Sequence, residues 1–278
     1  MKTFYRWPGN KLIHANKIIS FFPEKFNTYY EPFLGSGAIF LTLQHPKWVI
    51  NDLNIDVFNI WDHVQNNYTL LKRHLKLFIR TFKPLEIEDK KIFAQRHIEK
   101  LNKDNMSPAK RAAYYIMMKY VSYLGHIFVK NKFKFVGIEN NLYKENPPYY
   151  MGEKYILNLD KVHEYLNVGT SGRLFNTDYA KVLKLSRKGD FVFLDPPYYE
   201  PHVNYQFNYN KNEVVDISFL FELRSELKKL DKKGVKWLMT QSDIPDIHKV
   251  FGEYNFEKIK VYRRQKNTYV YELIVKNY

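Results

Sequence analysis

The stretch FVFLDPPYYEP, residues 191–201, places an acid and a tyrosine directly after a run of apolar residues. Residues 191–194 predict a short buried strand, and the prolines that follow must end it because they cannot donate to a strand ladder. In an open α/β sheet, ligands bind beyond the carboxyl ends of the strands. Asp195 and Tyr198 are therefore predicted to face a ligand. The alternative is a Pro-Pro turn that merely ends a strand.

A glycine-rich turn provides a second candidate ligand site. In YYEPFLGSGAIFLTL, a strand ending at Leu34 meets Gly-Ser-Gly at residues 35–37, and a helix follows. Glycines let the backbone turn tightly and approach a ligand closely at the amino end of a helix. The turn lacks the third glycine of a dinucleotide fingerprint and the Gly-Lys-Ser/Thr of a phosphate loop. The turn therefore argues against a dinucleotide-dependent hydride-transfer enzyme and against a phosphate-loop phosphoryl-transfer enzyme.

Two more strands end in acids. WVINDLNID ends a strand at Asp52, where a carboxylate can accept hydrogen bonds from a ribose diol. The alternative role of this acid is to cap the next helix, although Asn54 can do so instead. RLFNTDYAKVL ends another strand at Asp178 and Tyr179. There the acid can accept from an adenine amino group while the ring covers the face of the base.

The strands and helices expected around these residues indicate a wound α/β sheet. Helical patterns separate most of the strands. The last two strands are too close to hold a helix and predict a terminal antiparallel hairpin, because a parallel crossover needs about a dozen residues or more. A helix is expected over 216–234, with Asp216 or Ser218 as cap and Gly234 as its end. The predicted strands are 29–34, 48–51, 173–176, 191–194, 235–240, 256–262 and 269–275.

Composition favours a nucleic-acid partner. The 278 residues suit one large domain or a domain with an insertion, and 45% hydrophobic residues are ample for a core. Forty-four Lys and Arg against 29 Asp and Glu give +15, which favours a polyanion, although a basic surface can also serve solubility. Without cysteine there is no disulfide, thiolate nucleophile or Cys-based zinc site, and no metal site is predicted. No signal peptide or membrane span is evident, so cytoplasmic residence is expected.

Residues 66–172 interrupt the alternation of strands and helices. They hold 19 Lys and Arg against 10 Asp and Glu, about three-fifths of the net charge. SPAKRAAYYIMMKYVSY predicts a helix with Ser107 as N-cap and Pro108 in the first turn, and HIFVKNKFKFV predicts a hairpin that turns near Asn131. We expect an inserted domain that contacts nucleic acid. The alternative is a helical cap with a solvated basic face.

Six short motifs occur in a fixed order along the chain: RWPGNK, EPFLGSGA, NDLN, FNTDY, FLDPPY and YELIVKNY. This order resembles that of the Dam-type DNA adenine-N6 methyltransferases, in which a target-recognition insert separates the glycine turn from DPPY. The resemblance implies a Rossmann-like S-adenosylmethionine-dependent methyltransferase fold of class α/β, with a mixed sheet of about seven strands. Residues 1–65 and 173–278 would form the catalytic domain. Residues 66–172 would form a mainly helical recognition domain with a β-hairpin.

The resemblance also implies the ligands. They are S-adenosylmethionine as cofactor and double-stranded DNA as substrate, in a protein of bacterial or phage origin. A cognate restriction endonuclease and the oligomeric state are left open. The residues that would bind the cofactor are Trp7, Lys11, Phe33, Gly35, Ser36, Gly37, Asp52, Asp178, Tyr179 and Asp195.

Asp195, Pro196 and Tyr198 are the catalytic residues that the resemblance implies. The exocyclic amine of adenine is a poor nucleophile because its lone pair is delocalised into the ring. A carboxylate at Asp195 and the main-chain carbonyl of Pro196 would both accept from that amine and direct its lone pair toward the sulfonium methyl. Because the amine is unreachable inside a duplex, the base must leave the stack, and Tyr198 is expected to stack on it.

The target sequence does not carry over from the family. Members that recognise GATC carry an arginine in the hairpin of the insert, whereas this chain has lysines. Arginine is the better bidentate partner of guanine, so the expected base contact is missing. Lys130, Asn131, Lys132 and Lys134 are the remaining candidates for contact with DNA.

Two alternative functions stay open. One is methyl transfer to cytosine N4 or to RNA, although Asp before Pro-Pro-Tyr and the large basic insert argue against RNA. The other is a catalytically inactive DNA-binding homologue, which would not require Lys11, Asp52 and Asp195 together. A second stretch, ENPPYY at 145–150, spells the Asn-Pro-Pro-Tyr of related amino methyltransferases. No buried strand is predicted before it, so Asn146 is expected in a loop.

Overall fold

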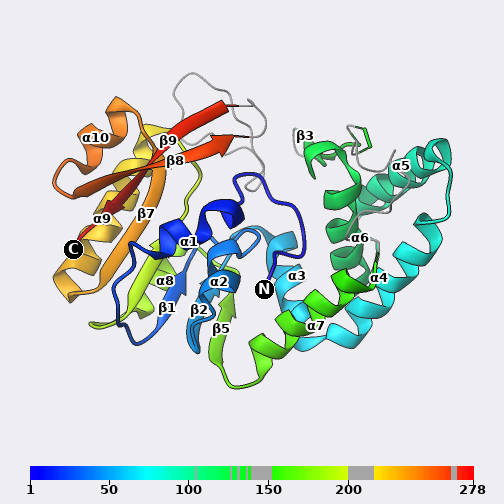
Figure 1. Cartoon of the computed structure of the whole chain (residues 1–278), viewed down its shortest axis with the longest axis horizontal. Helices are drawn as coiled ribbons and strands as arrows, with labels where there is room; N and C mark the ends of the chain where they lie inside the picture. The colour runs from blue at the N-terminus through cyan, green and yellow to red at the C-terminus, as the bar shows by residue number, and fades with distance from the viewer. Residues whose placement is uncertain are drawn as a thin grey trace.

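The computed structural model describes residues 1–103, 105–125, 127–129, 132–135, 137–138, 152–199, 216–263 and 268–278. Within these residues, seven strands form one sheet in the order β5-β2-β1-β6-β7-β9-β8 (Figure 1). The α/β class with a mixed sheet is as predicted. The strands are β1 (Tyr29–Glu31), β2 (Lys47–Asn51), β5 (Ser171–Phe175), β6 (Phe191–Leu194), β7 (Lys236–Ser242), β8 (Asn255–Arg263) and β9 (Thr268–Lys276).

The strand directions agree with those predicted from the lengths of the connections between strands. β5, β2, β1, β6 and β7 are parallel to one another, whereas β9 is antiparallel to both β7 and β8. The predicted terminal hairpin is therefore confirmed. The predicted strand boundaries differ from the observed ones by up to three residues, and the largest difference is in β1, which ends at Glu31 rather than at residue 34. Pro32 follows and has no N–H for the ladder, although the amide of Leu34 again donates to the carbonyl of Asn51 at 3.0 Å.

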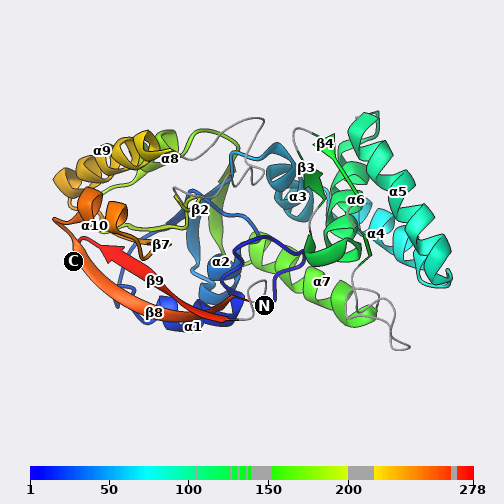
Figure 2. The same cartoon turned by 90° about the horizontal axis from the view of Figure 1, so that it is seen from above.

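Helices cover both faces of the sheet, because the central strands are apolar on both sides. In β6, Phe191 and Phe193 belong to one core cluster, whereas Val192 and Leu194 belong to the other. Figure 2 shows α8 and α9 on one side of the sheet and α1 and α2 on the other. The helices of the two faces are α1 (Ala15–Ile19), α2 (Ala38–Leu43), α8 (Tyr179–Leu185), α9 (Ile217–Lys233) and α10 (Pro245–Phe251), with the short 3-10 helix η1 (Leu12–His14) before α1.

The helix ends follow the predicted capping residues. The side chain of Asp216, rather than that of Ser218, caps α9, and Gly234 ends the helix at φ 69°. A left-handed residue of this kind is favourable for glycine because it has no Cβ. The helix α3 (Ile55–Asn66) is capped by Asn54, whose side chain accepts from the backbone amides of its first turn. Asp52 is therefore not the cap of α3.

The segment 66–172 contains the predicted helices and hairpin. The strands of the predicted hairpin are β3 (Phe128–Val129) and β4 (Lys132–Phe133), which pair antiparallel. Lys130 and Asn131, where the turn was predicted, lie outside the described residues. The second Pro-Pro-Tyr stretch, with Asn146, also lies outside them. The other elements of this segment are α4 (Tyr68–Phe82), α5 (Ile87–Lys103), α6 (Pro108–Val121), the 3-10 helix η2 (Tyr123–Gly125) and α7 (Glu153–Asn167).

The helices of this segment lie to one side of the sheet, with the N-terminal residues between (Figure 2). The hydrophobic core of the α1 face continues through α3 into α4, α5, α6 and α7. Among the described helices, none is long and apolar enough to cross a membrane.

Candidate active site

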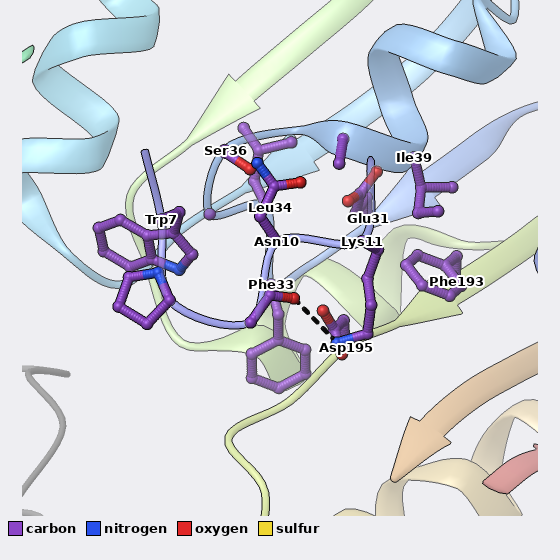
Figure 3. Close-up of a pocket in the computed structure, with 14 residues that line it drawn as sticks. Trp7, Asn10, Lys11, Glu31, Phe33, Leu34, Ser36, Ile39, Phe193 and Asp195 are labelled. Carbon is purple, nitrogen blue, oxygen red and sulfur yellow. Dashed lines mark hydrogen bonds and ion pairs between the residues drawn. The ribbon is translucent and has the colours of Figure 1, made fainter. Parts of the chain in front are cut away.

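A pocket lies where the N-terminal segment crosses the carboxyl ends of β1 and β6 (Figure 3). Six of the predicted cofactor residues line it: Trp7, Lys11, Phe33, Gly35, Ser36 and Asp195. Residues that were not predicted also line it, namely Pro8, Gly9, Asn10, Glu31, Leu34, Ala38, Ile39 and Phe193. The structure thus brings together motifs that are up to about 190 residues apart in the chain.

The glycine turn is shaped by two tryptophans. Gly35 and Gly37 have φ of 48° and 64°, a left-handed region that favours glycine. A Cβ at Gly35 would lie 2.8 Å from the indole of Trp7, and one at Gly37 would lie 2.5 Å from the ring of Trp61. Only glycine fits at either position. Trp7 therefore packs directly on the backbone of the turn and forms one wall of the pocket.

Asp52 is tied to the glycine turn by hydrogen bonds. Its Oδ2 accepts from the amide of Gly35 at 2.7 Å, and its Oδ1 accepts from the amide of Asn54 at 2.9 Å. The residue is 2% exposed, and burial raises the pKa of its carboxyl from 3.8 to about 6, although the two amides oppose the rise. Asp52 thus links the end of β2 to the glycine turn, although it does not itself line the pocket.

Asp178 and Tyr179 lie beside the pocket rather than in its lining. The ring of Tyr179 lies 5.1 Å from that of Phe33, which is a pocket residue. The carboxylate of Asp178 caps α8 by accepting from the amide of Ala180 at 2.8 Å. The two aromatic rings continue the pocket wall from the glycine turn toward α8. These contacts are all within the protein, and the contacts of Asp178 and Tyr179 with adenine remain a prediction.

Lys11 and Asp195 form an ion pair across the pocket. The Nζ of Lys11 lies 2.9 Å from Oδ1 of Asp195 and also donates to the carbonyl of Gly9 at 3.0 Å. In Figure 3 the lysine side chain extends from the N-terminal segment toward the end of β6. Only 8% of the Lys11 side chain and 22% of the Asp195 side chain are exposed. The opening motif and the DPPY motif therefore meet at one point.

Tyr198 lies next to this ion pair. The Nζ of Lys11 is 4.7 Å from the centre of the Tyr198 ring, which is a cation–π distance. The Tyr198 hydroxyl donates to Oε2 of Glu272 at 3.0 Å. Burial and then the charge of Glu272 raise the pKa of this hydroxyl well above its usual 10. Tyr198 is thus a neutral donor, and its carboxylate partner comes from the closing motif YELIVKNY.

Three polar residues of the site were missed in the sequence. Glu31 is 2% exposed and accepts from the Tyr29 hydroxyl at 2.6 Å. Burial raises the pKa of Glu31 well above 4.5. Thr240 and Glu272 are also buried and contact the DPPY residues. Each is a buried polar residue in a strand that also carries buried apolar residues, and this is the signal that could have identified them.

The insert presents lysines next to an anchored hairpin strand. Lys132 and Lys134 are exposed, whereas Phe133 between them is partly buried. The backbone of Phe133 makes two hydrogen bonds of 2.8 Å with the side chain of Asn102 in α5.

Charged side chains of α6 in the insert contact the catalytic half. Arg111 forms a bidentate pair with Asp56 of α3, at 2.6 and 3.2 Å. The Nζ of Lys119 lies 4.9 Å from the ring of Trp7. Lys119 is 2% exposed, and burial lowers its pKa from 10.5 to about 8. The pocket wall is thus packed against the insert.

Comparisons with known proteins agree with this arrangement. A family model described as D12 class N6 adenine-specific DNA methyltransferase matches residues 7–267. The chain is 29% identical over 287 residues to type II methyltransferase M1.LlaDCHI of Lactococcus lactis subsp. cremoris, covering all of this chain and 96% of that protein. It is 26% identical to type II methyltransferase M.MjaIII of Methanocaldococcus jannaschii, covering 100% and 99% of the two chains. It is 23% identical to the DNA adenine methylase of Haemophilus influenzae, covering 98% and 92%. The chain therefore belongs to the D12 class N6 adenine-specific DNA methyltransferase family, an adenine-specific class of enzyme whose methyl donor is S-adenosylmethionine.

Proposed function

We propose that this enzyme methylates the N6 amine of an adenine that has left the stack of double-stranded DNA, with Asp195, Pro196 and Tyr198 holding the base. The observation that carries the proposal is the position of Asp195. It follows β6, lines the pocket of the glycine turn and lies 2.9 Å from Lys11. A turn that merely ends a strand would not need a mostly buried ion pair at this point.

The pocket suits the parts of S-adenosylmethionine, which supplies a methyl group bonded to a positively charged sulfur. The buried carboxylate of Asp52, beside a turn where only glycine fits, is the acceptor proposed for the ribose hydroxyls. The rings of Phe33 and Tyr179 provide apolar faces for the adenine, and Asp178 is the acceptor proposed for its amino group. Trp7, Lys11 and residues 35–37 are the candidates for the methionine end.

Asp195 and Pro196 would act on the amine of the target base. In transfer, the nitrogen lone pair forms the new N–C bond, the C–S bond breaks with its electrons going to sulfur, and one proton leaves the nitrogen. Acceptors at the carboxylate and at the carbonyl of Pro196 stabilise the positive charge that develops on the nitrogen. The Tyr198 ring would stack on the extruded base.

DNA would lie between the catalytic half and the insert. The insert, residues 66–172, carries three-fifths of the net charge. Its hairpin lysines Lys132 and Lys134 are exposed on either side of the anchored Phe133. This arrangement supports phosphate or base contacts from the hairpin, and Lys130 and Asn131 remain candidates from the sequence. Similarity to proteins named type II methyltransferases supports a cognate restriction endonuclease as the functional partner.

The test is methylation of DNA with tritiated S-adenosylmethionine, followed by identification of the labelled base and its sequence context. We expect N6-methyladenine at a fixed sequence in duplex DNA. Label in cytosine, label only in RNA, or no label from a protein that binds both ligands would each contradict the proposal. The matched variant is Asp195→Ala. It should lower turnover by orders of magnitude and leave most of the DNA affinity, because phosphate contacts dominate affinity.

A further inference from the structure

We propose that Thr240 and Glu272 are positioning residues for methyl transfer, Thr240 by orienting the carboxylate of Asp195 and Glu272 by orienting Tyr198. The inference rests on the proposed function of the DPPY residues and extends it to two strands that the motif does not include. Thr240 belongs to β7 and Glu272 belongs to β9. Neither residue lines the pocket, so each would act through its DPPY partner rather than on a ligand.

Sheet order places these residues beside the motif. β6 pairs with β7 in the register Leu194 to Met239, so Thr240 is one residue further along β7, next to Asp195. β7 pairs with β9 in the register Ser242 to Glu272. The two side chains therefore reach the carboxyl end of β6 from neighbouring strands. Rigid strands hold catalytic side chains more accurately than loops do.

Thr240 determines which oxygen of the Asp195 carboxylate can accept from the amine of the target base. The hydroxyl of Thr240 donates to Oδ1 of Asp195 at 2.6 Å, and Lys11 binds the same oxygen at 2.9 Å. Both of these contacts are made to Oδ1. A carboxylate with two donors on one oxygen is fixed in rotation, and its other oxygen remains to accept from a substrate amine. Thr240 is 0% exposed, so a bulk water molecule cannot easily replace its hydroxyl.

Glu272 fixes the ring of Tyr198 in the same way. Its Oε2 accepts the Tyr198 hydroxyl at 3.0 Å, and the same oxygen lies 4.0 Å from Nζ of Lys11. Glu272 is 5% exposed. A buried carboxylate is costly unless it is paired, and here its partners are a DPPY side chain and the lysine of the N-terminal motif. The acid thus links the two groups that lie on either side of Asp195.

The test of Thr240 compares two substitutions. Thr240→Val keeps the shape of the side chain and removes the hydroxyl, whereas Thr240→Ser keeps the hydroxyl. We expect Thr240→Val to lower kcat roughly ten- to a hundredfold with the KM for S-adenosylmethionine and the melting temperature nearly unchanged, because a donor to a charged acceptor is lost. Thr240→Ser should restore most of the turnover. Parental kcat in Thr240→Val, or equal losses in both variants, would overturn the role of the hydroxyl.

The test of Glu272 is a double-substitution cycle with Tyr198. Tyr198→Phe keeps the ring and removes the donor, and Glu272→Leu removes the acceptor. If the pair acts through its hydrogen bond, the double variant should lose no more turnover than the worse single variant. Additive losses would contradict the pairing. This cycle also decides the proposal if Thr240→Val does not fold.

Methylation by the parental enzyme distinguishes a failure of this inference from a failure of the proposed function, on which it rests. If the parental protein does not methylate adenine in DNA, the proposed function itself fails. If it does so and the Thr240 and Glu272 variants match its kcat, only the positioning role fails.

Discussion

At the scale of single residues, burial and hydrogen bonding determine how the acids of the site behave. Asp52 is buried and receives two backbone amides, yet burial still raises its pKa to about 6. Asp195 instead pairs with Lys11 at the pocket. Two acids at the ends of β2 and β6, the strands on either side of β1, are thus suited to different tasks, one beside the glycine turn and one beside the lysine.

The first prediction concerns cofactor affinity and pH. If the ionised carboxylate of Asp52 accepts from a ribose diol, affinity for S-adenosylmethionine should be full above pH 6 and fall as pH drops through that value. The loss should reach up to about tenfold per pH unit, because only the ionised fraction binds. Calorimetric titration between pH 5 and pH 8 measures the effect. Asp52→Asn should bind weakly with little dependence on pH, and the parental dependence in that variant would assign the titration to another group.

At the scale of elements, the side chains of residues 132–134, in and just after β4, alternate between exposed and partly buried. Phe133 packs beneath Arg111, whose guanidinium lies 5.6 Å from the ring. Arg111 in turn is paired with Asp56 near the start of α3, the helix that begins after Asp52. The hairpin is thus attached to the catalytic half through two side chains.

The second prediction concerns these hairpin lysines. Replacing Lys132 and Lys134 with alanine should weaken DNA binding and reduce the slope of log affinity against log salt by up to about 2, because each lost phosphate contact removes about one unit. Cofactor affinity should stay the same. The matched control replaces two other exposed lysines, Lys25 in the segment before β1 and Lys232 in the last turn of α9. Equal changes in both double variants would show that the hairpin has no special role.

The third prediction concerns the buried Lys119 of α6. Its pKa falls from 10.5 in the unfolded chain to about 8 in the folded protein, so below pH 8 the folded state buries a charge at a cost of roughly 3 kcal/mol or less. This cost disappears as pH rises from 8 to 10.5. Lys119→Met should therefore be more stable than the parent at pH 7, and its advantage should shrink toward pH 10.5.

Urea denaturation of both proteins at pH 7 and pH 10 measures this difference, because other titrating groups cancel between them. A stability difference that does not change with pH would contradict a depressed pKa for Lys119. A lower cofactor affinity in Lys119→Met would show in addition that the lysine supports the wall formed by Trp7.

At the scale of the whole molecule, the N-terminal segment joins the two halves. The carbonyl of Phe4 accepts from the hydroxyl of Tyr155 in α7 at 2.9 Å. The ring of Phe4 lies 4.9 Å from that of Trp61 in α3. The next residue, Tyr5, donates to the carbonyl of Gly35 in the glycine turn. Residues that precede the first motif are therefore part of the core.

The fourth prediction follows from this position. Phe4 is 0% exposed, so Phe4→Ala should lower the free energy of unfolding by about 3–5 kcal/mol, through lost burial and the cavity that remains. Phe221→Ala is the control, because Phe221 is 50% exposed on α9 and should change stability little. Urea denaturation compares the two. A small loss in Phe4→Ala would mean that the segment is only loosely attached.

The sequence by itself determined the local features of this protein. Apolar runs and turn residues located the strands, because burial on both faces of a parallel sheet leaves a continuous apolar signature. Capping chemistry is equally local, and it offered Asn54 as the alternative to Asp52 at the start of α3, which the structure bears out. Motif order placed Lys11, Gly35 and Asp195 in one site, and the pocket contains all three.

Only the tertiary structure decided which distant side chains contact these residues. Thr240 is 45 positions from Asp195, and Glu272 is 74 positions from Tyr198. Periodicity shows which face of a strand is buried, but the partners on that face depend on strand order and register. A buried threonine or glutamate within an apolar strand therefore indicates a polar partner without naming it. The sheet order β6-β7-β9 brings the two partners together at the end of one strand.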